Sequence, residues 1–312
     1  MAKKPRRSVF LAALIFIVCL EATRAAAQGA AAALPSQDAP CSLPGLAANA
    51  AKAPTAKDLL QAYNAQGRAI HSLRASLMLH AEDSAELDGK ISHSRPFPAM
   101  LSFRLPAAMR LTGAIPFSSR RIFDLTSDGH TFELLVPEGK KTRLIVGEAD
   151  APATSANPRE NVRPQAILEA IRLLPARISG ASVTNPGRLD LSRTLDVELA
   201  ASTGPVEARL EFDLRSGTIS HLSISDSHGN TDTEVDYGDW QQEPDGQQRG
   251  KVVCFPSRIL VTQPKQTRRL QMKFLSIEIN RPLPPSQFRF FPPPGVVVTR
   301  VGGGAGKSAA KP

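Results

Sequence analysis

Residues 101–146, LSFRLPAAMRLTGAIPFSSRRIFDLTSDGHTFELLVPEGKKTRLIV, decide the fold class of this chain. Apolar side chains hold the odd-numbered positions at its start: Leu101, Phe103, Leu105, Met109 and Leu111. Polar side chains lie between them: Ser102, Arg104 and Arg110. A period of two is typical of a strand with one face against apolar material and the other face in water. Turn residues at 127–129 and 137–140 extend the pattern into a meander of strands, whose apolar face another element must cover.

Two amphipathic helices are predicted outside this stretch. The first spans about residues 56–72 and begins at a capping box formed by Thr55 and Asp58. The second begins at Pro164, a residue suited to a first helical turn, and ends at Pro175. Apolar residues recur along both helices at helical spacing: Leu59, Tyr63, Ile167 and Ile171.

Further strands with alternating apolar and polar residues precede and follow these helices. They are predicted at about residues 74–80, 89–93, 195–199, 206–214, 218–225, 231–237, 252–255, 258–262 and 268–279. In the last of them the apolar phase changes between Phe274 and Leu275, which indicates a β-bulge. Many antiparallel strands interrupted by two helices indicate one α+β domain, with no linker that would divide it.

The first 27 residues have the order of a secretory signal peptide: a basic start, an apolar run over residues 9–20 and small residues at 25–27. The run is shorter than the ~20 residues that span a bilayer, so we expect export without a transmembrane helix in the mature chain. Cleavage lowers the 38 basic residues by five to 33 and the 29 acidic residues by one to 28, a small excess that does not indicate a nucleic-acid partner. We expect a flexible leader at 28–54, a folded domain at 55–301 and a disordered tail at 302–312.

Three cysteines bear on anchoring and on redox state. Cys19 lies inside the apolar run. Its acylation would anchor the protein to the outer membrane, but the bulky Val18 before it is a poor match to a lipoprotein cleavage site. Cys41 and Cys254 remain in the mature chain. In an oxidising compartment they form either a disulfide or two unpaired thiols, and the sequence leaves both alternatives open.

Motifs for catalysis, metal binding and cofactor binding are absent from the sequence. The six histidines have no metal-ligand spacing, and no GxSxG elbow marks a serine as a nucleophile. The acidic residues between 196 and 213 occupy the polar phase of two strands, which is an ordinary solvated face. The glycine-rich residues 302–308 lack the first glycine of a phosphate-binding loop, because Val301 stands there. We therefore expect neither an enzyme nor a cofactor.

Five local motifs carry a resemblance that spans residues 56–301. They are RLTGAIPF at 110–117, FDLTSDG at 123–129, RPQAILEA at 163–170, VDYGDW at 235–240 and FRFFPPPGV at 288–296. In their order and spacing they resemble the LolA/LolB superfamily of outer-membrane lipoprotein-sorting carriers, and LolB-like members most. The chain departs from the LolB pattern at the acylated cysteine, to which Cys19 is a poor match.

The resemblance implies a strongly curved antiparallel sheet, a half-open β-barrel, with α-helices capping its concave face. It also implies an apolar cavity between sheet and helices that receives lipid acyl chains. The residues that match its wall and lid are Leu59, Tyr63, Leu101, Phe103, Leu105, Met109, Leu111, Ile167 and Ile171. For each of them an ordinary closed core is the alternative. The loop with Ile115 and Phe117, followed by Arg120 and Arg121, matches the apolar loop with which LolB-like members touch the membrane.

The expected function is that of a non-enzymatic, monomeric carrier of lipids or lipoproteins in the periplasm or at the outer membrane. Its partners would be acyl chains or lipoproteins, with transient contact to a membrane surface. Two alternatives stay open. One is an envelope-stress sensor similar to RseB, which uses the same half-barrel to bind protein. The other is a structural envelope protein with a filled core.

Overall fold

One large sheet positions the other elements of the structure. The computed structural model describes residues 41, 54–87, 90–93, 95–116, 118, 120–138, 141–149, 164–184, 191–201, 204–289 and 291–301, with the backbone alone at 83–87, 90–93, 138 and 180–184. The predicted signal peptide, Phe117 and the tail at 302–312 lie outside the described residues, as does the leader apart from residues 41 and 54. The described residues belong to one compact unit.

The strands fall into two groups along the chain. The first group is β1 (Ser72–Leu87), β2 (Lys90–His93), β3 (Phe97–Arg104), β4 (Ala108–Ala114), β5 (Arg121–Ser127), β6 (Thr131–Glu138) and β7 (Lys141–Glu148). The second group is β8 (Ala176–Thr184), β9 (Ser192–Ala201), β10 (Gly204–Asp213), β11 (Ile219–Ser225), β12 (Thr231–Pro244), β13 (Val252–Gln263), β14 (Arg268–Ile279) and β15 (Val297–Val301). The expected meander over residues 101–146 is thereby confirmed as β3 to β7, whereas β8 and β15 were not predicted.

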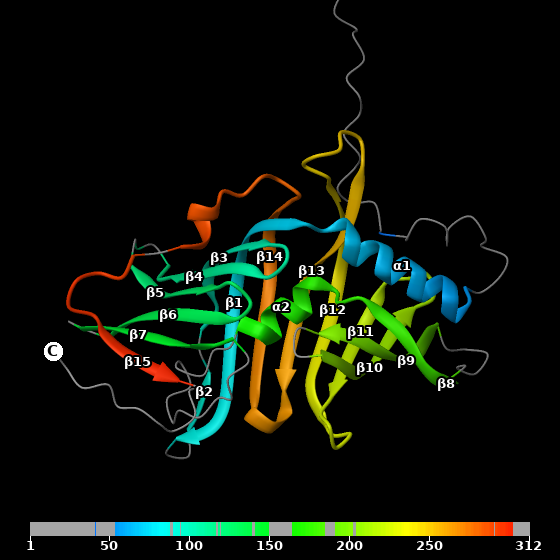
Figure 1. Ribbon diagram of the computed structural model, residues 1–312, viewed down its shortest axis with the longest axis horizontal. Coiled ribbons are helices and arrows are strands. Elements are labelled where there is room, and N and C mark those ends of the chain that lie inside the picture. Colours follow the sequence, from blue (N-terminus) through cyan, green and yellow to red (C-terminus); the bar gives the residue numbers. More distant parts are fainter. Residues whose placement is uncertain are drawn as a thin grey trace, which may run out of the picture. The chain divides into compact units, whose positions relative to one another are not determined.

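All these strands belong to one curved sheet (Figure 1). Their order is β15-β7-β6-β5-β4-β3-β1-β14-β13-β12-β11-β10-β9-β8, and β2 pairs with β1 beside this path. The two ends of the order, β15 and β8, do not pair with each other, so the sheet is not closed. Neighbouring strands are antiparallel with one exception, because β15 pairs with β7 in parallel, Val297 opposite Arg143. The expectation of a purely antiparallel sheet is wrong at this edge, where the C-terminal residues return to a distant strand.

The helix α1 (Ala56–Ala69) begins as predicted and ends earlier than predicted. At its start, the Thr55 backbone N–H donates to Asp58 Oδ2 (2.9 Å) and the Asp58 N–H donates to Thr55 Oγ1 (3.2 Å), which confirms the capping box. At its end, Asn280 Nδ2 donates to the Ala69 carbonyl oxygen (2.7 Å). Asn280 Oδ1 accepts from the His71 N–H (2.7 Å), so one side chain ends the helix and holds the start of β1.

The second helix, α2 (Pro164–Arg172), lies in front of the sheet together with α1 in Figure 1. α1 contacts β8 and β13, and α2 contacts β5 and β13. The Tyr237 hydroxyl on β12 donates to the Ala170 carbonyl oxygen of α2 at 3.0 Å. The buried side chains of both helices belong to the same hydrophobic core as the odd-numbered residues of β3 and β4.

The predicted β-bulge is present in β14. Ser276 lies opposite Ser76 of β1, whereas the next pair joins Leu77 to Phe274. Leu275 is therefore the extra residue, and its side chain is 60% exposed.

The sequence predicted that the polar face of β3 and β4 meets water, but in the structure another segment of the chain covers it. Residues 281–289, which we call the C-terminal strap, contact it. Gln287 Nε2 donates to Ser102 Oγ (2.8 Å), and Arg104 Nη1 donates to the Leu283 carbonyl oxygen (2.9 Å). Arg110 Nη1 donates to the Arg289 carbonyl oxygen at 3.1 Å. The expectation is wrong because these polar side chains bind main-chain and side-chain groups of the strap.

Candidate functional site

An apolar pocket of about 590 Å³ lies at the end of β3 to β6 that adjoins the β4–β5 loop. Its volume is within the range of about 300–1,000 Å³ that is common for small-ligand sites. The described residues of its lining are apolar apart from one arginine: Ala81, Arg95, Pro96, Phe97, Ile115, Pro116, Ile122, Phe123, Leu134 and Val136. Such a lining fits an alkyl chain.

The pocket continues the core face of the sheet to its open end. Gly113 lies opposite Ala99 on one side and opposite Phe123 on the other, and Leu101 lies opposite Leu111 one step deeper. Because side chains alternate, Phe97 and Phe123 point to the same face as Leu101 and Leu111.

The pocket opens to solvent at its rim. Leu134 and Val136 are buried, whereas Arg95, Pro96 and Pro116 are exposed. The Ile115 side chain, also at the rim, is 40% exposed. An alkyl chain could therefore enter the pocket beside the β4–β5 loop and reach the buried side chains of Leu134 and Val136.

Gly113 sets the shape of the pocket wall. The Phe97 and Phe123 rings pack edge to face, with their centroids 6.1 Å apart. A Cβ atom at position 113 would lie 2.8 Å from a carbon atom of each ring. Real carbon atoms make contact at about 3.5–4.0 Å, so the aromatic pair needs glycine beneath it.

Most of the residues predicted to line a cavity lie in the packed core instead of beside this pocket. Eight of them are buried: Leu59, Tyr63, Leu101, Phe103, Met109, Leu111, Ile167 and Ile171. Leu105 lies in the turn after β3 and is partly buried against the same core. None of the nine lines the pocket, although β3 contributes residues to both regions.

Sequence reasoning missed Phe97, Phe123, Leu134 and Val136 as pocket residues. Phe123, Leu134 and Val136 belong to the predicted meander, whereas Phe97 precedes it. What was missing was the information that the core face is filled in the middle of the strands and open at one end.

Tyr63 brings an unusual polar group into the core. Its ring packs edge to face on Phe212, with a centroid distance of 6.3 Å. Its hydroxyl is buried and has no hydrogen-bond partner in the part of the chain that is described. Burial raises the pKa of Tyr63 far above its ordinary value, because the phenolate would be desolvated.

The β4–β5 loop carries the predicted membrane contact. The Ile115 N–H donates to the Arg120 carbonyl oxygen at 2.9 Å, which closes the loop. Arg121 is not free for a headgroup, because its Nη1 donates to the buried Asp124 (2.5 Å), which Arg110 also binds (2.7 Å). Phe117, the other predicted contact, lies outside the described residues.

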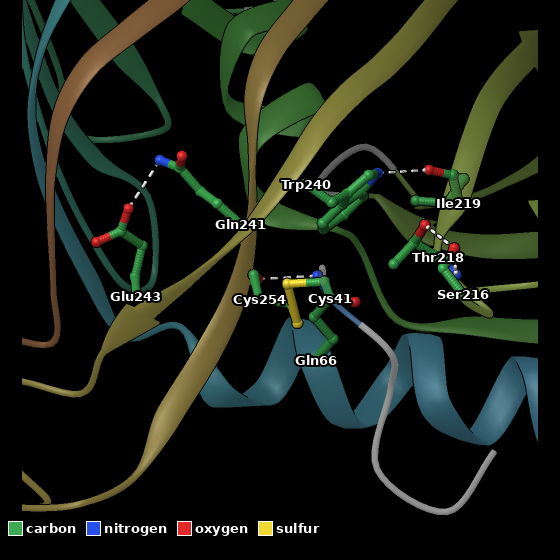
Figure 2. Close-up of a disulfide and its surroundings, with 9 residues drawn as sticks. All are labelled: Cys41, Gln66, Ser216, Thr218, Ile219, Trp240, Gln241, Glu243 and Cys254. Atoms are coloured by element: carbon green, nitrogen blue, oxygen red, sulfur yellow. Dashed lines mark hydrogen bonds between the residues drawn. A yellow bond between two sulfur atoms is a disulfide. The ribbon is translucent and has the colours of Figure 1, made fainter. Parts of the chain in front are cut away.

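Cys41 and Cys254 form a disulfide, which decides between the two alternatives left by the sequence (Figure 2). Their Cα atoms are 5.9 Å apart, and the bond joins residues separated by 213 positions. The pair packs against Ala62 of α1 and Trp240 of β12. Gln66 Nε2 of α1 donates to the Cys254 carbonyl oxygen at 3.0 Å, so the disulfide and this bond both lie where α1 meets β13.

The described residues contain neither a metal-binding cluster nor a membrane-spanning helix. In the described ranges no group of three or more His, Cys, Asp or Glu side chains is arranged to hold a metal ion. No helix of the described part has the length and hydropathy to cross a bilayer.

Comparison with known proteins gives matches in structure only. No family model matches the sequence, and no curated protein does. A DUF1329 family protein from Desulfovibrio piger is similar in structure at 11% identity, with 74% of this chain and 95% of that chain covered and a TM-score of 0.48. A LolA superfamily protein from Nitrosomonas europaea is similar at 12% identity, with 76% and 99% covered and a TM-score of 0.45. A putative outer-membrane lipoprotein-sorting protein domain from Vibrio parahaemolyticus is similar at 9% identity, with 74% and 94% covered and a TM-score of 0.44. A LolA superfamily protein, from the group that the sequence motifs resemble, is thus among these structural neighbours.

Proposed function

We propose that this chain is a non-enzymatic carrier that holds lipid acyl chains in the cell envelope. The observation that carries the proposal is the apolar pocket of about 590 Å³, which opens beside an exposed apolar loop. Each methylene group buried there contributes about 0.8 kcal/mol. A chain that buries about eight methylene groups therefore gains ~6 kcal/mol before the cost of ordering it, enough for reversible binding.

The core next to the pocket extends the proposal. Leu101 and Leu111 lie one step deeper than Ala99 and Gly113 on the same face of the sheet. A longer acyl chain would therefore contact Leu101 and Leu111 next. In this proposal α1 and α2 cap the concave face, and their buried residues form the lid. Support comes from the single core that both helices share with the sheet.

Filling the pocket tests the carrier function. We expect the purified protein to take up a fluorescent fatty acid, and native mass spectrometry of protein prepared without detergent to show bound acyl species. Ala81→Trp places a large ring in the pocket and should weaken uptake by about tenfold or more. Met78→Trp, on the opposite face of β1, is the matched control and should bind as the wild type does.

Native mass spectrometry and fatty-acid uptake also distinguish a carrier from a protein that binds no lipid. The eight buried residues of the predicted cavity favour a structural envelope protein with a filled core as the second candidate. A strictly unliganded mass, with no uptake on titration, would end the carrier proposal and favour the structural protein or the sensor similar to RseB.

Contact with a membrane is the second part of the proposal. Ile115 and Phe117 would enter the lipid surface, and the export expected from residues 1–27 would bring the chain to the envelope. Ile115→Glu and Phe117→Glu should each reduce flotation with anionic liposomes. Ile178→Glu is the control, because Ile178 on the edge strand β8 is 44% exposed, close to the 40% of Ile115. Equal flotation of all variants would exclude the loop as the contact.

A further inference from the structure

We propose that the pocket selects amphiphiles whose headgroup is an anion, and that Arg95 at the rim recognises this group. The inference rests on the proposed binding of acyl chains and adds the chemistry of the other end of the ligand. Carboxylate and phosphate share that chemistry, since a guanidinium group binds either one through two parallel hydrogen bonds.

Among the described residues that line the pocket, Arg95 alone is charged. It follows β2 and precedes Pro96 and Phe97, so its backbone is next to the aromatic wall. Its side chain is exposed, and it forms no ion pair with the described residues. A chain whose tail lies on Leu134 and Val136 would leave its polar end at this rim.

Three arginines of β3, β4 and β5 are already bound by other groups. Arg110 and Arg121 both bind the buried Asp124. Arg104 donates to the strap, and its guanidinium carbon lies 5.0 Å from the centre of the Phe288 ring. Arg120 in the β4–β5 loop is exposed as well, but Arg95 is the arginine that lines the pocket, so its charge is available to a ligand there.

The alkyl chain and the arginine have separate effects on binding. Chain burial provides affinity for any headgroup, whereas Arg95 distinguishes an anion from a neutral group. Because the rim is open to water, the ion pair is worth what exposed pairs are worth, about a 3- to 5-fold gain in affinity at low salt. The gain should shrink as salt screens the pair.

The test compares three probes with the same alkyl chain, namely dodecanoate, dodecyl phosphate and dodecanol, each below its micelle-forming concentration. They displace a bound fluorescent fatty acid from the full chain at low and at high salt. We expect both anions to bind wild type about 3- to 5-fold more tightly than dodecanol. Arg95→Gln should bring all three to the affinity of dodecanol, and Arg95→Lys should restore most of the preference. Arg74→Gln removes an exposed arginine from the opposite face of β1 and should change nothing.

The possible outcomes distinguish this inference from the function on which it rests. An anion preference that persists in Arg95→Gln, or that is absent in wild type, overturns the role of Arg95 while dodecanol binding still supports the carrier. A preference for only one of the two anions in wild type, lost in Arg95→Gln, supports the role and identifies the headgroup. Failure of all three probes to bind wild type refutes the proposed function itself.

Discussion

Gly113→Ala should distort the pocket more than it harms the fold. The added Cβ would lie 2.8 Å from a carbon atom of both Phe97 and Phe123, so each ring must move by roughly 0.7 Å to reach normal contact. Overpacking costs about 1–3 kcal/mol, and loss of the edge-to-face contact costs about 0.5–1.5 kcal/mol. The smaller conformational freedom of alanine in the unfolded chain returns about 0.4–1 kcal/mol. We expect a net loss of about 2 kcal/mol in the free energy of unfolding, within a range of ~0.5 to ~4 kcal/mol.

The rings can move only toward the free side, which is the pocket. Binding of the fluorescent fatty acid should therefore weaken in Gly113→Ala, while urea unfolding remains one cooperative transition. Phe97→Leu removes one of the two clashing ring carbons. In a double-mutant cycle it should recover part of both losses, because the two positions are in contact. Unchanged affinity in Gly113→Ala, or strictly additive effects in the cycle, would refute this account of the wall.

Three further predictions concern the core and the disulfide. Cys254→Ser removes the disulfide that closes a loop of 213 residues, and the chain-entropy model predicts that the free energy of unfolding falls by about 5 kcal/mol. Urea unfolding of the variant and of the oxidised wild type measures this loss. Tyr63→Phe should raise the free energy of unfolding by about 1 kcal/mol, because it removes a buried hydroxyl that has no partner among the described residues. Tyr237→Phe should lower the free energy of unfolding by about 1 kcal/mol, because it removes the hydrogen bond to the Ala170 carbonyl oxygen. Equal effects of the two substitutions would contradict this explanation. Burial raises the pKa of Glu169 above its ordinary value of 4.5, so the folded state keeps the carboxyl proton to a higher pH than the unfolded state does. The free energy of unfolding therefore falls as pH rises from the unfolded-state pKa to the folded-state pKa. Glu169→Gln should flatten the pH profile of the unfolding free energy between these two pKa values and be more stable than wild type above the folded-state pKa.

Local patterns in the sequence were sufficient for most of the strands. At the turn before β6, Asp128 Oδ1 accepts from the Thr131 N–H (2.8 Å) and Gly129 has a φ of 93°, so a short run of residues determines its own conformation. The capping box of α1 and the bulge at Leu275 are equally local. Features of this kind depend on neighbours in sequence and can be predicted from them.

Features that join distant parts of the chain could not be found in this way. The disulfide joins positions separated by 213 residues, and no local pattern favoured it over two free thiols. The strap binds Arg104 and Arg110 through main-chain carbonyl groups, which every residue has. The edge strand β8 was missed because residues 179–182 are small or polar and show no alternation.

The position of the pocket shows why its residues were only partly predictable. Alternation identifies the face of β3 and β4 that turns away from water, and this holds along both strands. Whether that face is filled depends on the size of side chains that meet across strands. In the middle Leu101 lies opposite Leu111, and the core is packed, whereas at the open end Ala99 lies opposite Gly113. The Phe97 and Phe123 rings take up the space above Gly113, and both rings line the pocket. The sequence signal for this aromatic wall is therefore a pair of small residues on the core face beside aromatic ones, and it becomes visible only once the register between the strands is known.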